Sequence, residues 1–149
     1  MIFSNDRDAL RDVYLQAWQK AQTYQPLTPL ETQIAQVISE HPEYHALLTE
    51  SGRSAAYFPE LGQTNPFLHM GLHLAIREQV ATDRPLGIRT LFKCLCQQTQ
   101  DASEAEHQMM DMLVETLWES QRSLQPPNES TYLERLKKLV MRGIFPSPL

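Results

Sequence analysis

The chain has 149 residues, a hydrophobic fraction of 42% and a formal net charge of −5, which suit one domain with one apolar core. Its lysines and arginines are scattered singly, which argues against a nucleic-acid surface or a polybasic membrane patch. No stretch approaches the roughly 20 apolar residues of a membrane span, and the first residues lack a basic region followed by a long apolar run. We therefore expect a cytoplasmic protein with no membrane or nucleic-acid partner.

Prolines and glycines divide the sequence into segments whose apolar residues recur every three or four positions, the period of an amphipathic helix. No segment shows sustained alternation, so we expect an all-α fold, a compact bundle of about six helices in a single domain over residues 1–142, followed by a C-terminal tail over 143–149. The predicted helices cover 5–24, 29–40, 65–81, 83–98, 101–123 and 128–141, with a short extra helix over 42–49 and an ordered loop over 51–64.

Several of these helices carry recognisable start signals. Thr28-Pro29-Leu30-Glu31 is a capping-box sequence with proline at the first helical position, and Asn65-Pro66 repeats the order of cap and proline. The helix over 101–123 has two candidate caps, Asp101 and Ser103, and Ser103 with Glu106 would form a second capping box. The first helix is expected to bury an apolar stripe made of Leu10, Val13, Tyr14, Ala17 and Trp18.

The five histidines carry most of the functional information. All of them lie between positions 41 and 107 in segments predicted to be helical. Neutral imidazole binds Zn, Fe, Mn and Ni, and facing helices can bring three or four such ligands together. We therefore predict a metal-binding site for one of these divalent ions. The candidate ligands are His41, His45, His69, His73 and His107.

Helical geometry refines this site. Residues four apart stack on one face of a helix, so His69 and His73 project together, and Glu78 falls on roughly the opposite side and should not join them. The pair His41 and His45 has the same spacing. If His41 is the N-cap residue before proline, however, its backbone is not helical, and only His45 is oriented by the helix.

A dinuclear site fits the sequence less well than a mononuclear one. Carboxylate-bridged di-iron bundles use glutamates from four helices, two of which carry a Glu-x-x-His motif. This chain has one such motif, Glu104 to His107, and more histidines than aligned acids. The sequence therefore favours a mononuclear, histidine-rich site.

A metal-free interpretation stands beside this one. Buried imidazoles are also satisfied by backbone carbonyls or neighbouring carboxylates, so the same histidines suit a hydrogen-bond network in a structural or protein-interaction module. A partner would then meet the loop over 51–64 or the apolar pair Ile144-Phe145, and the apolar tail would permit a homodimer. Clustered imidazoles would also suit a pH sensor, for which the sequence offers no separate support.

Other reactive motifs are absent from the sequence. Cys94 and Cys96 lie two residues apart and point to different sides of a helix, so they form no Cys-x-x-Cys element. We find no Gly-x-Ser-x-Gly turn and no glycine-rich phosphate loop. The methionines at 109, 110 and 112 have the helical spacing of core residues. No reaction or substrate is predicted, and the chain is not assigned as an enzyme.

Four segments of the chain resemble an uncharacterised bacterial family, domain of unknown function 1841. They are HPEYH at 41–45, GQTNPFLHMGLHLAIREQ at 62–79, Asp83-Arg84-Pro85 with Gly87-Ile88, and AEHQMMDMLVETLW at 105–118. The resemblance extends from about Asn5 to Val140 and implies no activity. It implies that all five histidines occupy motif positions. It also favours Glu106, next to His107, as the acidic candidate ligand, whereas helix geometry favours Glu104.

Overall fold

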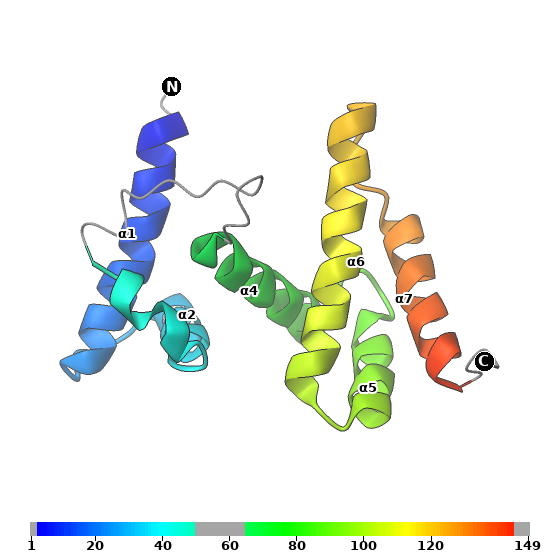
Figure 1. Ribbon diagram of the computed structural model, residues 1–149, viewed down its shortest axis with the longest axis horizontal. Coiled ribbons are helices and arrows are strands. Elements are labelled where there is room, and N and C mark those ends of the chain that lie inside the picture. The colour runs from blue at the N-terminus through cyan, green and yellow to red at the C-terminus, as the bar shows by residue number, and fades with distance from the viewer. Residues whose placement is uncertain (1–2, 50–64, 145–149) are drawn as a thin grey trace. The chain divides into compact units, whose positions relative to one another are not determined.

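The computed structural model describes residues 3–49 and 65–144, and the regular elements within these ranges are all helices (Figure 1). In chain order they are α1 (Phe3–Gln22), α2 (Pro29–Ser39), the 3₁₀ helix η1 (Pro42–Leu47), α4 (Pro66–Thr82), α5 (Ile88–Thr99), α6 (Ala102–Ser123) and α7 (Glu129–Ile144). The all-α prediction is confirmed. The predicted loop over 51–64 lies outside the described residues. None of the described helices has both the length and the apolar character needed to cross a membrane.

The chain divides into two compact units, residues 1–74 and residues 75–149, and the division falls within α4. The first unit holds α1, α2, η1 and the start of α4, and the second holds the end of α4 with α5, α6 and α7. Helix α7 continues to Ile144, beyond the predicted start of the tail at residue 143. The assignment of residues 1–142 to a single domain stays a prediction.

The first unit is built around the contact of α1 with α2. Its core consists of Tyr14, Ala17, Ile34, Val37, Ile38, Phe67 and Met70. The predicted stripe of α1 is only partly correct, because Leu10 is 58% exposed and Val13 is 38% exposed. The buried face of α1 is instead centred on Arg11, Tyr14 and Ala17, and the Arg11 guanidinium lies 4.8 Å above the Phe67 ring. A cation can occupy this face because the aromatic ring beneath it stabilises its charge.

In the second unit, α5 packs against both α6 and α7, and α6 packs against α7. Met109 and Met110 are buried there, which confirms the interpretation of these two methionines as core residues. Polar side chains also join the helices: the Tyr132 hydroxyl donates to Gln79 Oε1 at 2.7 Å, and Gln98 Nε2 donates to the Val140 carbonyl at 2.8 Å.

The capping box of α2 is confirmed. The backbone N–H of Glu31 donates to Thr28 Oγ1, and that of Thr28 donates to Glu31 Oε1. The other oxygen of Glu31 accepts from Lys20 Nζ at 2.8 Å, so one carboxylate both caps α2 and links it to α1. At α6 the cap is Asp101, which accepts from the N–H groups of Ser103 and Glu104.

Helix α5 begins at Ile88, later than the predicted start at Asp83. The Asp83 backbone has a positive φ of 52°, and its carboxylate accepts hydrogen bonds from the N–H groups of Gly87 and Arg89. Asp83 and Pro85 therefore belong to a turn that precedes α5, whereas the sequence predicts a helix that already begins at residue 83.

We expect Glu31→Gln to reduce stability in a pH-dependent way. The hydrogen bond from Lys20 and that from the Thr28 backbone lower the pKa of Glu31. A lowered pKa in the folded state means that the carboxylate stabilises the fold above its ordinary pKa, and that this contribution is lost as the pH falls through the lower, folded-state value. Urea unfolding should therefore separate wild type from Glu31→Gln at about pH 7 and show convergence in acid. Glu129→Gln, in the first turn of α7, controls for the loss of an acidic residue at a helix start; a gap that persists unchanged in acid would contradict the prediction.

Candidate metal centre

Three histidines come together in the first unit. His41 lies between α2 and η1, whereas His69 and His73 lie on α4. Each offers a ring nitrogen, and these nitrogens lie within 4.8 Å of one another. His73 is 1% exposed and His41 is 8% exposed, so the group is largely shielded from solvent. Within this unit, three of the five histidines singled out in the sequence therefore lie close together.

Local structure explains how these rings meet. Asn65 caps α4 by accepting from the N–H groups of Phe67 and Leu68, which fixes the start of the helix and the direction of its faces. His69 and His73, four residues apart, therefore project from one side of α4. His41 is the N-cap residue of η1 with φ −126° and ψ 65°, so its backbone is non-helical, as expected.

The hydrogen bond of His41 defines which of its nitrogens is available. His41 Nδ1 lies 2.7 Å from the Val37 carbonyl oxygen. Because a carbonyl oxygen only accepts, Nδ1 carries the proton, and the lone pair of the neutral ring is on Nε2. Metal-binding histidines are commonly oriented in this way, by a backbone carbonyl on the nitrogen that does not bind the ion.

His69 and His73 present their Nε2 atoms to each other at 3.1 Å. Without an ion, one of these nitrogens donates and the other accepts. The spacing also suits two ligands of one ion, since nitrogens about 2.05 Å from a tetrahedral zinc lie about 3.3 Å apart. Pairs near the upper limit of 4.8 Å would have to close by roughly 1 to 1.5 Å to share that ion.

His45 takes a different role. Its Nε2 donates to the Ile38 carbonyl at 2.8 Å, and its ring lies 4.5 Å from that of Trp18. His45 lies within η1 and His41 is its non-helical N-cap residue, but this helix is 3₁₀. Three residues complete a turn of a 3₁₀ helix, so a spacing of four no longer places two side chains on one face.

The three-residue turn of η1 also places Tyr44 beside the histidine cluster, although no sequence motif singled out this residue. Tyr44 lies three residues after His41, and their rings stack with centroids 5.5 Å apart and planes 2° apart. The Tyr44 ring also meets that of His69 edge-on at 6.1 Å. Desolvation, and secondarily the charge of Glu43, raises the pKa of Tyr44, so its phenol stays protonated in the neutral range. A spacing of three after His41-Pro42 is the signal that could have identified it.

In the second unit, the acid next to His107 is engaged in an ion pair. Arg77 Nε lies 3.2 Å from both carboxylate oxygens of Glu106, and Arg77 Nη2 lies 3.1 Å from Oε1. Glu106 is buried, and this pair replaces the capping box predicted for Ser103 and Glu106. A carboxylate held by charge-assisted bonds has less electron density to offer a metal. His107 itself is half-buried on α6.

The remaining candidates of the sequence analysis lie elsewhere. Glu78 and Glu104 are both exposed. Cys94 and Cys96 are free thiols, and burial raises the pKa of Cys96, with further contributions from Glu106 and Asp101. A raised pKa disfavours the thiolate, which is the form that binds metals. Burial therefore makes Cys96 a poor candidate ligand.

The chain belongs to the family described as Domain of unknown function (DUF1841), whose model matches residues 6–138. The match confirms the resemblance found in the sequence segments, and it includes all five histidines, Arg77 and Glu106. No curated protein and no solved structure matches the chain.

We expect Glu106→Gln to lower the free energy of unfolding by about 2 kcal/mol in urea titrations. Loss of one partner from a fully buried ion pair costs roughly 3–5 kcal/mol, and the cost is smaller here because the Arg77 side chain is 27% exposed. Glu104→Gln is the matched control, since Glu104 is exposed on the same helix, and it should change stability by less than about 0.5 kcal/mol. Equal effects of the two substitutions would show that the ion pair contributes no special stability.

Proposed function

Membership of the DUF1841 family assigns no activity, and we propose from the geometry that the protein binds one divalent transition-metal ion through His41, His69 and His73. The observation that carries this proposal is the buried cluster of three imidazoles whose ring nitrogens lie within 4.8 Å of one another. The hydrogen bond from His41 Nδ1 to the Val37 carbonyl supports it, because it orients the ring and directs Nε2 away from that carbonyl as the nitrogen available to an ion.

The ligand chemistry favours zinc among the candidate ions. Three neutral nitrogen donors suit Zn, Ni and Fe, whereas Mn prefers sites richer in oxygen ligands. Zinc accepts tetrahedral nitrogen sites without a preference imposed by its d electrons, and α4 already presents two nitrogens at 3.1 Å. Zinc is therefore the first ion to test, followed by Ni, Fe and Mn.

His107 is proposed as the fourth ligand. Helix α4 is continuous from Pro66 to Thr82, so Arg77 follows His73 by one helical turn. Arg77 binds Glu106, the residue next to His107 on α6. This ion pair would therefore act as a positioning contact for the imidazole of His107, and Glu106 itself is not included among the ligands.

The number of ligands decides what the ion does. Three imidazoles leave a coordination position for water, which is the arrangement of hydrolytic zinc sites, where the metal lowers the pKa of the bound water. Four imidazoles close the site, as in zinc centres that stabilise a fold. The proposal with His107 bound thus describes a closed centre, and its three-histidine form describes an open one.

A metal-free role is the second candidate. The hydrogen bonds of the imidazoles support this role, because they need no metal ion. His69 and His73 are hydrogen-bonded to each other, and His41 is hydrogen-bonded to the Val37 carbonyl. In this case the imidazoles form a buried hydrogen-bond network that stabilises the first unit, and the protein serves as a structural or protein-interaction module. The two candidates differ in whether metal removal affects stability.

Metal analysis of untagged protein should find about one ion per chain after incubation with zinc. His41→Ala and His73→Ala should each bring the content near zero, because each removes a ligand that the three-histidine site requires whether or not His107 also binds. His45→Ala is the matched control, since His45 bonds the Ile38 carbonyl and packs on Trp18, and it should retain the ion.

The melting temperature with and without chelator completes this test. Metal bound about a hundredfold above its dissociation constant stabilises the fold by about 2.7 kcal/mol, so a chelator should destabilise wild type and leave His73→Ala unchanged. Failure of the wild-type protein to take up zinc, nickel, iron or manganese would establish the metal-free role instead.

His107→Ala tests the fourth ligand. Loss of one of four imidazoles should weaken zinc binding by roughly tenfold or more while some binding remains, as measured by competition with a chromophoric chelator. Glu106→Gln should reduce affinity less than His107→Ala does, since it removes a positioning contact and leaves the ligand. Unchanged affinity in His107→Ala would assign the ion to the three histidines of the first unit and leave a position open for water.

A further inference from the structure

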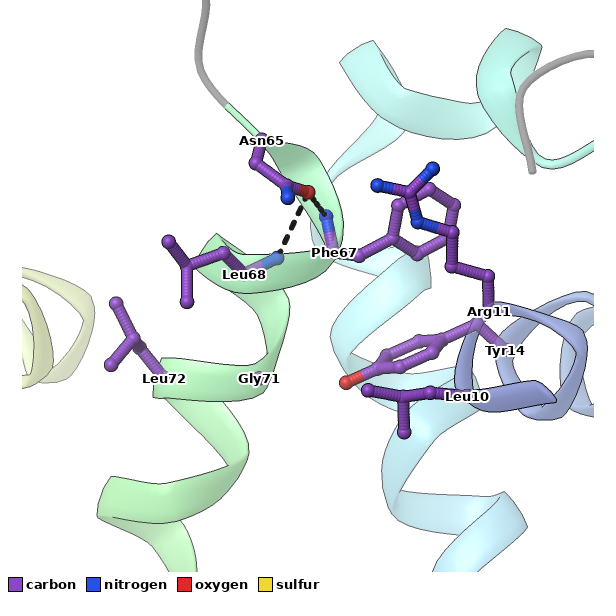
Figure 2. Close-up of a pocket in the computed structure, with 8 residues that line it drawn as sticks. All are labelled: Leu10, Arg11, Tyr14, Asn65, Phe67, Leu68, Gly71 and Leu72. Atoms are coloured by element: carbon purple, nitrogen blue, oxygen red, sulfur yellow. Dashed lines mark hydrogen bonds between the residues drawn. The ribbon is translucent and has the colours of Figure 1, made fainter. Parts of the chain in front are cut away.

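A cavity in the first unit lies between α1 and α4, with a volume of about 370 Å³ (Figure 2). Its apolar lining comes from both helices and consists of Leu10, Phe67, Leu68 and Leu72. Polar groups are added by Arg11, Tyr14 and Asn65. Figure 2 shows the Arg11 guanidinium over the Phe67 ring near the start of α4, whereas Leu72 lies farther along that helix and Leu10 lies on α1. The Tyr14 hydroxyl lies beside Gly71 and Leu10, so the cavity combines an apolar lining with polar groups at several points.

Gly71 lines this cavity. A Cβ atom at this position would lie 3.5 Å from the Tyr14 hydroxyl oxygen, an ordinary contact distance. One methyl group therefore fits, but a branched side chain would extend into the space between the two helices. A glycine in a helix interior lowers helix stability by about 1 kcal/mol relative to alanine. At position 71 the glycine borders the cavity between α1 and α4.

The polar groups around the cavity can all donate hydrogen bonds. Arg11 is the one charged side chain among the described lining residues, and its five N–H donors allow it to serve several partners at once. Asn65 uses its Oδ1 atom to cap α4, which leaves its NH₂ group as the donor. Burial raises the pKa of Tyr14, so its hydroxyl keeps its proton.

We propose that this cavity binds a small monocarboxylate with an apolar chain, its carboxylate at Arg11 and its chain against Leu10 and Leu72. A planar guanidinium matches a carboxylate in geometry and charge, and the absence of acidic side chains from the described lining favours an anion. At roughly 30 Å³ per non-hydrogen atom, the volume holds about a dozen such atoms, which is the size of a medium-chain fatty acid.

This proposal does not depend on the metal. Leu68 and Gly71 lie on a different side of α4 from His69 and His73, because successive residues are about 100° apart around a helix. Metal content and carboxylate binding can therefore be measured separately, and either can fail without the other.

Calorimetric titration with three probes of equal chain length tests the ligand class. Octanoate should bind roughly tenfold more tightly than 1-octanol, because a hydrogen bond to a charged group contributes more than one to a neutral group, and octylamine should not bind. Equal binding of octanoate and 1-octanol would overturn the assignment of an anion site. A lack of binding by all three probes would overturn the proposed ligand class.

Variants then locate the site. Gly71→Leu should abolish octanoate binding by filling the cavity, and Gly71→Ala is its control, with affinity within about threefold of wild type. Arg11→Met should weaken binding roughly tenfold or more, whereas Arg142→Met, at an exposed position of α7, should not. Thermal melting of each variant shows whether it is folded. Full affinity in folded Gly71→Leu would place the octanoate elsewhere and overturn the proposal.

Discussion

The hydrogen bond between His41 Nδ1 and the Val37 carbonyl ties the imidazole of a candidate metal ligand to the end of α2. Val37 belongs to the last turn of α2, and its carbonyl also accepts from the backbone N–H of Glu40 at 3.2 Å. Pro42 ends the α-helical path directly after His41, so the imidazole can turn back to this carbonyl. The contact thus orients the ring and leaves its second nitrogen for a partner from α4.

Much of the architecture follows from short-range sequence signals. The capping box at Thr28, the Asn65-Pro66 start of α4 and the four-residue spacing of His69 and His73 all depend on residues close in sequence, and each predicted its local structure correctly. Such signals work because caps and helical faces are determined within one or two turns.

The structure differs from the predictions where a residue contacts a distant segment of the chain, or where a helix is 3₁₀ and not α. The burial of Arg11 in place of Leu10 depends on the Phe67 ring, which lies on another helix. The pair of Arg77 with Glu106 joins residues 29 apart in sequence, and no local pattern signals it. The spacing of His41 and His45 indicated a shared face, but four-residue spacing predicts one only in an α-helix, and η1 is a 3₁₀ helix.

Helix α4 carries His69 and His73, the open space at Gly71 and the cation Arg77 within a few turns, and it extends from the first unit into the second. Because a helix is rigid over this distance, the angular positions of these residues are fixed by the number of residues between them. Inserting or deleting one residue between His73 and Arg77 would turn the side chains of the remaining residues of α4 by about 100° about the helix axis relative to the histidines. This segment should therefore tolerate many substitutions at exposed positions such as Glu78, but no change in its length.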